Sequence, residues 1–283
     1  MIWFYLALIG AFLTAAYWIL LKKSLKDIDQ FTLAGGVFLV SSAVLFIYSM
    51  ANGIPSIGEF FYIALFSAAI SNAAVSALTY YALSTCELSL SIPMLSFTPV
   101  FLILTSYLIL GEKTSLLGAL GILFIVFGCI VIETGKECGK RKNWNWRKGE
   151  FLMLIVAFLY SICGNLDKML IKNSDPTFGT AFEFLIMCAI LWSFSVFKEK
   201  KPTKIFKENF WAFVVLGLVC SVSTIFINTA LQIQIVPYVI AIKRLSILFA
   251  VLYGAIILKE HHPARRILGA GIMVAGAIII AMF

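Results

Sequence analysis

Two adjacent basic residues, Lys243 and Arg244, lie inside the apolar segment 236–260, about a third of the way along it. The segment is long enough to cross a bilayer as a helix, which takes about 20 residues. A charge near the centre of a membrane helix costs about 2.5–3.5 kcal/mol on insertion scales. A lysine can extend its ammonium towards the interface, but a neighbouring arginine on another side of the helix cannot easily do so at the same time. The pair therefore favours buried acids, a water-filled cavity or an anionic ligand.

Three more ionisable residues, Asp167, Lys168 and Glu183, lie inside other apolar segments of the chain. The first two are near the end of segment 149–171, and the third is about one and a half turns into segment 178–197. Ionisable residues inside membrane spans usually line substrate pathways, ion pathways or proton relays. All five charges are expected in one leaflet and define a candidate site.

Two interpretations of these five charges stay open. In the first, Lys243 and Arg244 bind an anionic group directly, because arginine offers a planar fork and lysine a compact point charge. Lys168 is then a third candidate ligand, and Asp167 and Glu183 orient the cations or carry a coupling proton. In the second, the two acids neutralise the adjacent cations within the protein, and Lys168 extends towards the headgroups.

Polar residues also recur at three- and four-residue steps in the apolar segments 60–83 and 209–231. This spacing places each set on one face of a helix. Such a stripe either lines a cavity or forms hydrogen bonds between helices. The further candidates for substrate binding in these stripes are Asn72, Tyr80, Asn228 and Gln232.

The composition is typical of a polytopic membrane protein. The 283 residues are 61% hydrophobic and only 13% charged, with a mean hydropathy of +1.00, whereas a soluble domain is about one quarter charged. The six cysteines are scattered, and no cysteine or histidine spacing indicates a metal site. We expect no metal, no cofactor and no nucleic-acid partner, and we attribute the net charge of +8 to topology and lipid contact.

Ten apolar segments are predicted as transmembrane helices of an all-α integral membrane fold. Pro93 and Pro99 predict a kink or a break in the fourth of them. Five segments lie on each side of the longest loop, which spans residues 134–148. The predicted spans are about 2–21, 32–51, 60–83, 88–110, 115–133, 149–171, 178–197, 209–231, 236–258 and 264–283.

The two halves of the chain show signs of duplication. Several residues match at an offset of 148 positions, and an odd number of spans in each repeat inverts the second repeat relative to the first. We therefore predict two inverted five-helix repeats, residues 1–133 and 149–283, joined by the basic loop 134–148. The matched pairs are Glu112 with Glu260, Gly121 with Gly269, and Gly128 with Gly276.

Lysine and arginine are distributed unequally between the loops. The loops after the first, fifth, seventh and ninth segments hold 17 of the 22 basic residues, and the other loops hold only Lys113 and Lys172. The positive-inside rule then places the basic loops in the cytoplasm and both termini outside. On this topology Lys243 and Arg244 lie in the outer half of the membrane, where the rule does not account for them.

The chain resembles the drug/metabolite transporter superfamily, in particular its EamA type. The resemblance rests on the five-plus-five layout, on the endings Leu110-Gly111-Glu112 and Leu258-Lys259-Glu260, and on the glycine-bearing segments that follow them. It implies a secondary transporter that moves a small organic solute through a central cavity by alternating access, with no covalent chemistry.

Three details refine this resemblance. The basic pair is similar to one in the ninth span of sugar-phosphate translocators, distant relatives that bind phosphate there, although spans 3 and 4 here contribute no basic residue. Ten-span members usually keep both termini in the cytoplasm, which is the reverse of the charge count. The first span lacks the glutamate that four-span relatives use to export cationic drugs.

We expect a transporter of a small anionic or zwitterionic metabolite in the cell membrane, monomeric or weakly dimeric, and not an enzyme. The alternatives are a flippase for a lipid-linked anion, a multidrug or amino-acid exporter and, more remotely, a membrane-embedded enzyme or a retinal-type receptor. A transferase would need clustered acids for Mg²⁺, which the spans lack. A receptor could use Lys243 as a Schiff base, but ten duplicated spans argue against it.

Overall fold

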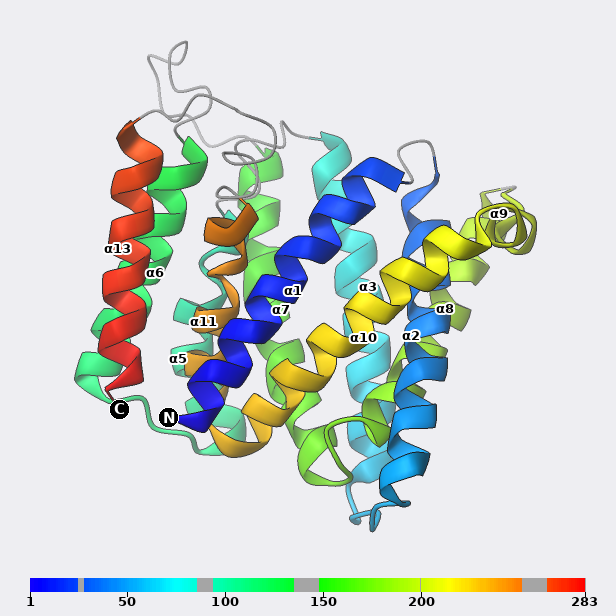
Figure 1. The fold of residues 1–283 in the computed structure, drawn as a ribbon, viewed down its shortest axis with the longest axis horizontal. Helices are drawn as coiled ribbons and strands as arrows, with labels where there is room; N and C mark the ends of the chain where they lie inside the picture. The colour runs from blue at the N-terminus through cyan, green and yellow to red at the C-terminus, as the bar shows by residue number, and fades with distance from the viewer. Residues whose placement is uncertain (25–27, 86–93, 135–147, 199, 251–263, 283) are drawn as a thin grey trace.

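The computed structural model describes residues 1–24, 28–85, 94–134, 148–198, 200–250 and 264–282, and the regular structure in these ranges is helical (Figure 1). Six of the helices are long and apolar enough to cross a membrane, and three shorter ones are also apolar. The helices are α1 (Ile2–Ser24), α2 (Gln30–Asn52), α3 (Phe61–Thr85), α5 (Thr98–Leu110), α6 (Leu116–Thr134), α7 (Lys148–Lys172), α8 (Phe178–Phe197), α9 (Pro202–Glu208), α10 (Phe210–Ile233), α11 (Val236–Lys243) and α13 (Ala264–Ala281).

The helices pair as an approximate two-fold axis requires. Helix α6 packs against its own counterpart α13, and α2 packs against its counterpart α8, at opposite ends of the molecule (Figure 1). The other contacts occur in related couples: α1 with α10 matches α3 with α7, and α2 with α10 matches α3 with α8. The predicted all-α membrane fold with inverted repeats is therefore confirmed. The repeat boundaries at residues 133 and 149 stay a prediction, because residues 135–147 lie outside the described part of the chain.

Glycines allow α6 and α13 to approach closely, as the small residues of these segments predict. A Cβ atom added at Gly276 would lie 2.6 Å from the carbonyl oxygen of Gly121, and one added at Gly128 would lie 2.7 Å from that of Gly269. Because Gly121 is the counterpart of Gly269 and Gly128 of Gly276, these two contacts are related by the same two-fold axis. The last helices of the two repeats, α6 and α13, thus form a symmetric antiparallel pair within one chain.

Replacing Gly276 with alanine is expected to destabilise the fold by about 1–3 kcal/mol, the usual cost of overpacking. The clashing atom is a backbone oxygen, so the two helices must separate. The matched control is Gly271→Ala in the same helix, where an added Cβ meets no atom within 4 Å. The control is expected to be neutral or stabilising by about 0.5–1 kcal/mol. Unfolding measured in mixed micelles distinguishes the two, and equal stabilities would contradict the tight contact.

The fourth and ninth segments are both interrupted. Helix α5 begins at Thr98 after a turn at Ser96 and Phe97, and Pro99 lies in its first turn, as predicted; Pro93 lies outside the described residues. The prediction of one helix over 236–258 is wrong, because α11 ends at Lys243 and a turn at Arg244 and Leu245 precedes a further helical stretch, 246–250. Ser96 and Arg244 are 148 positions apart, so the two interruptions occupy equivalent places in the repeats.

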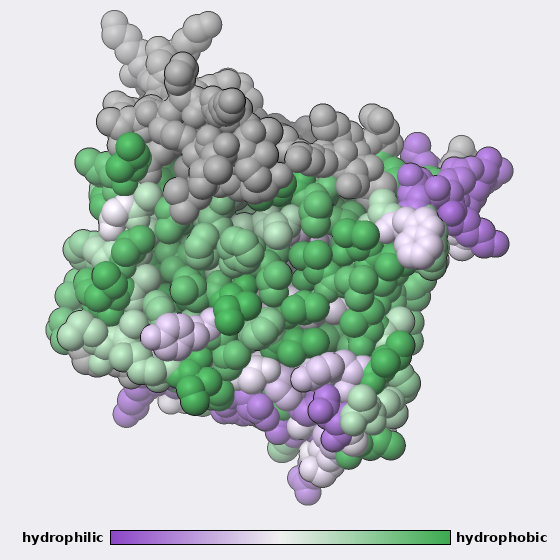
Figure 2. Space-filling view, in the orientation of Figure 1, coloured by the Kyte–Doolittle hydropathy of each residue, from purple (hydrophilic) through white to green (hydrophobic). Residues whose placement is uncertain are grey.

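The molecule has two faces that bear on topology. Both chain ends and the loops 53–60, 111–115 and 173–177 lie along the lower edge in Figure 1, which we call the terminal face. The short helix α9 lies towards the opposite edge, within the basic stretch that follows α8. Figure 2 shows a broad apolar surface between the two edges, as a chain embedded in a bilayer requires.

Candidate functional site

Two carboxylates, one buried and one half-buried, are held together by one amide of the helix bundle. Asn72 of α3 donates from Nδ2 to Oδ1 of Asp167 on α7 and to Oε1 of Glu183 on α8, at 2.8 Å in each case. The two acceptor oxygens can therefore be no more than twice that distance apart. Glu183 is only 3% exposed. Two carboxylates this close repel one another when both are ionised, so they favour a cation or a proton nearby.

The basic pair lies at the break in the ninth segment and faces the same region. The Lys243 ammonium lies close enough to the Asp167 carboxylate for the two charges to attract one another. Arg244 donates from Nη2 to Oγ1 of Thr98 at 2.9 Å, which links the break after α11 to the start of α5. Within the described ranges, no carboxylate forms an ion pair with the Lys243 ammonium. The second interpretation of the sequence, in which Asp167 and Glu183 neutralise Lys243 and Arg244 within the protein, stays open, because an acid can balance a cation without a direct ion pair.

A separate ion pair links the helices at the terminal face. Lys168 Nζ lies 2.5 Å from Glu112 Oε1 and donates to the carbonyl oxygen of Gln234 at 2.6 Å. Glu112 Oε2 accepts the backbone N–H of Val236 at 2.9 Å. That N–H belongs to the first residue of α11, where the helix dipole favours a negative charge. These four residues, which we call the clasp, join the end of α5, helix α7 and the start of α11.

The other predicted residues lie apart from the acid–base cluster or cannot be placed in it. Asn228 donates from Nδ2 to the carbonyl oxygen of Pro176 and to Oγ1 of Thr180, both at 2.8 Å, and so stabilises the start of α8. Gln232 is exposed near the end of α10. The side chain of Tyr80 lies outside the described part, although its backbone belongs to α3.

Sequence reasoning missed three residues of this region: Thr98, Tyr160 and Glu112. Tyr160 is within electrostatic range of Arg244, and its hydroxyl accepts from Oγ1 of Thr79 at 3.4 Å. The repeat offers a signal for Thr98. The counterpart of Arg244 at the 148-residue offset is Ser96, and Thr98 follows it by two positions, so both lie at an interrupted helix. The partner of Glu112 is 56 positions away in the sequence, and no local signal indicates it.

The arrangement places two cations and two acids where both interrupted helices meet. Interrupted helices expose backbone groups that regular helices do not, and in transporters they form substrate and ion sites near the membrane midplane. Lys243 and Arg244 can bind a carboxylate or a phosphate. Asp167 and Glu183 can balance these charges or bind a cationic group of the same ligand.

Comparisons with known proteins agree with this architecture. The family model described as "EamA-like transporter family" matches residues 1–134 and 147–282. An "Uncharacterized transporter" of Archaeoglobus fulgidus is 24% identical over 267 residues, which are 92% of this chain and 91% of that protein. A solved structure named only as "Crystal structure of protein" superposes with a TM-score of 0.80 and covers 98% of this chain and 96% of its own. At 14% identity this last match shows the fold alone.

Proposed function

Because the chain belongs to the EamA-like transporter family, we propose that this membrane transporter is a secondary carrier of a small anionic or zwitterionic organic solute. The observation that supports this substrate class is the environment of Lys243. A cation lies at a helix break, and Asn72 engages both Asp167 and Glu183, while the described part of the chain shows no ion pair to this lysine. A half-buried cation of this kind is stabilised by a ligand that brings negative charge.

The same geometry suggests how the solute is bound. Its anionic group contacts Lys243 and Arg244, and Thr98 fixes the guanidinium of Arg244 from the other interrupted helix. Asp167 and Glu183 keep the empty site close to neutral, and they provide a place for an ammonium group if the solute is a zwitterion. Lys168 becomes a further ligand only if its ion pair with Glu112 opens.

Alternating access then requires the two repeats to rock about the site. The clasp joins Glu112 of the first repeat to Lys168 of the second, so it can hold the terminal face closed during the cycle. We propose that this face is the outer one, because 17 of the 22 basic residues lie in loops predicted on the opposite side. The protein acts in the cell membrane as a monomer or a weak homodimer.

A thermal-shift screen of the purified protein against carboxylates, phosphates, amino acids and organic cations tests this proposal. A ligand that binds only the folded state raises the melting temperature by mass action. We expect an anionic or zwitterionic class to stabilise the native protein. Lys243→Gln is expected to lose about 1.5–3 kcal/mol of that binding, the range for a hydrogen bond to a charged group, which is roughly 10- to 150-fold in Kd.

The control variant is Lys207→Gln, which changes an exposed lysine of α9, the short helix towards the edge opposite the terminal face (Figure 1). It is expected to keep the full ligand response. If only cations stabilise the protein, or if anions stabilise native protein and Lys243→Gln equally, the basic pair is structural and the proposed substrate class is wrong.

A further inference from the structure

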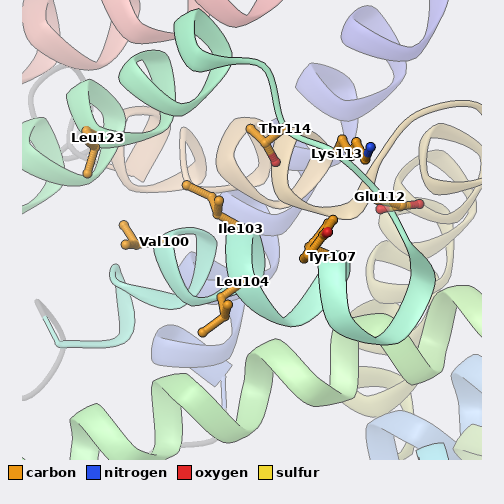
Figure 3. Close-up of a pocket in the computed structure, with 8 residues that line it drawn as sticks. All are labelled: Val100, Ile103, Leu104, Tyr107, Glu112, Lys113, Thr114 and Leu123. Atoms are coloured by element: carbon orange, nitrogen blue, oxygen red, sulfur yellow. The ribbon is translucent and has the colours of Figure 1, made fainter.

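A groove opens between α5 and α6 and extends to the loop that joins them at the terminal face (Figure 3). Its volume is about 630 Å³, which is within the usual range of ligand sites, about 300–1,000 Å³. The proposed solute site uses neither its apolar walls nor its polar end. The residues that line it are Val100, Ile103, Leu104, Tyr107, Glu112, Lys113, Thr114 and Leu123.

The long wall of the groove is apolar and faces the surroundings of the helices. Leu104 is 57% exposed and Leu123 is 47% exposed, and Val100 and Ile103 lie between them in Figure 3. In a membrane these side chains meet acyl chains. An acyl chain already surrounded by lipid gains only packing when it enters such a groove. Any preference for one lipid over another therefore has to come from the polar end.

The polar end offers donors and a positive charge. Lys113 is exposed there, and it is the one basic residue in the described loops 53–60, 111–115 and 173–177 of this face; Lys172 ends α7 beside them. The hydroxyl of Thr114 is buried and has no hydrogen-bond partner in the described part of the chain; in Figure 3 this hydroxyl points towards Tyr107. A buried hydroxyl without a partner is costly, and an acceptor oxygen placed in the groove would remove that cost.

We propose that the groove between α5 and α6 is a binding site for one membrane phospholipid of net negative charge. The acyl chain lies along Leu104 and Leu123, and the phosphate lies against the ammonium of Lys113 and accepts a hydrogen bond from Thr114. The charge of Lys113 complements an anionic headgroup, and the apolar wall selects a lipid over free phosphate. This site requires only that the protein spans a membrane, and it does not depend on the transported solute.

The site is also adjacent to the clasp. Glu112 lines the groove and holds Lys168 and the start of α11 with the same carboxylate. When a lipid phosphate pairs with Lys113, this lysine no longer competes for the Glu112 carboxylate, which keeps Lys168 as its counter-ion. A bound lipid is therefore expected to stabilise the closed terminal face.

Native mass spectrometry tests the proposal on intact protein released from detergent after equilibration with equal amounts of phosphatidylglycerol and phosphatidylcholine. The native protein is expected to retain one phosphatidylglycerol with a preference of about five-fold, the usual effect of one basic residue near anionic lipid. Lys113→Gln is expected to remove the preference. Leu104→Trp, which fills the groove, is expected to remove retention of both lipids.

Two matched variants serve as controls. Lys172→Gln changes the exposed lysine that ends α7 at this face, and Leu108→Trp adds the same bulk at an exposed position of α5 that does not line the groove. Both are expected to retain the lipid as the native protein does. The proposal is overturned if Lys113→Gln keeps the preference, if Leu104→Trp and Leu108→Trp behave alike, if inorganic phosphate displaces the lipid, or if a second copy of the chain is bound in its place. Lys113 is a surface residue, so its variant decides the question even if Leu104→Trp does not fold.

Discussion

Glu112→Gln is expected to destabilise the protein by about 3–5 kcal/mol, the cost of leaving a buried charge without its partner. The side chains of Lys168 and Glu112 are 4% and 8% exposed, so water does not replace the lost carboxylate. The carbonyl oxygen of Gln234 still accepts from Lys168 but carries no charge to balance the ammonium. The measurement is the free energy of unfolding in mixed micelles.

The double variant Glu112→Gln with Lys168→Met separates the loss of a pair from the loss of one charge. It is expected to recover most of the stability, because replacing a whole buried pair by neutral groups is often neutral or stabilising. The exposed pair of Lys204 and Glu208, 3.7 Å apart and 70% and 58% exposed, is the control. Glu208→Gln is expected to cost at most about 1 kcal/mol. If Glu112→Gln costs no more than this control, the clasp does not hold the terminal face closed.

The clasp also shows which part of the site the sequence could predict. The charged residues of the site could be predicted, because a charge inside an apolar segment stands out in the sequence wherever it occurs. The partners were not, because a side chain at the end of one helix can reach any helix that ends at the same face. The nearest cation in sequence to Glu112 is Lys113, but the structure pairs Glu112 with Lys168.

The long helices were easier to predict than the interrupted ones. The length of the apolar segment alone indicates helices such as α2 and α8, because a membrane-spanning helix forms its backbone hydrogen bonds within itself. The break at Arg244 has no such local signal, since neither proline nor glycine occurs in residues 238–250. The signal lies in the other repeat, where Pro99 follows the turn at Ser96. Transferring that break by 148 positions would have placed it at Arg244.

The breaks and the cluster are connected physically. A helix interrupted inside a membrane leaves backbone groups without intrahelical partners, and these must be satisfied by neighbours or by a cavity. The Arg244 guanidinium reaches Thr98 at the other break, so each interruption supports the other. The symmetry of the fold thus brings the two breaks together, and the unequal sequences of the repeats supply the charges, which come from α7, α8, α11 and the turn after α11 in the second repeat.

Asn72 of the first repeat donates a hydrogen bond to each acid, and Asn72→Leu is expected to destabilise the protein by about 3–6 kcal/mol. Two hydrogen bonds to carboxylates are lost, each contributing about 1.5–3 kcal/mol, while the side-chain size is nearly kept. Asn52→Leu is the control, because Asn52 is exposed and donates only to the carbonyl oxygen of Tyr48 in its own helix. The control is expected to change stability by no more than about 0.5 kcal/mol.

The loss in Asn72→Leu is expected to be relieved when one of the two acids is made neutral. The amide donor matters most when Asp167 and Glu183 are both ionised, because two neighbouring charged acceptors then lack it. Adding Asp167→Asn to Asn72→Leu removes one of these charges and should therefore restore most of the stability. A deficit that is not rescued would mean that Asn72 acts through packing, and that the two acids do not repel each other.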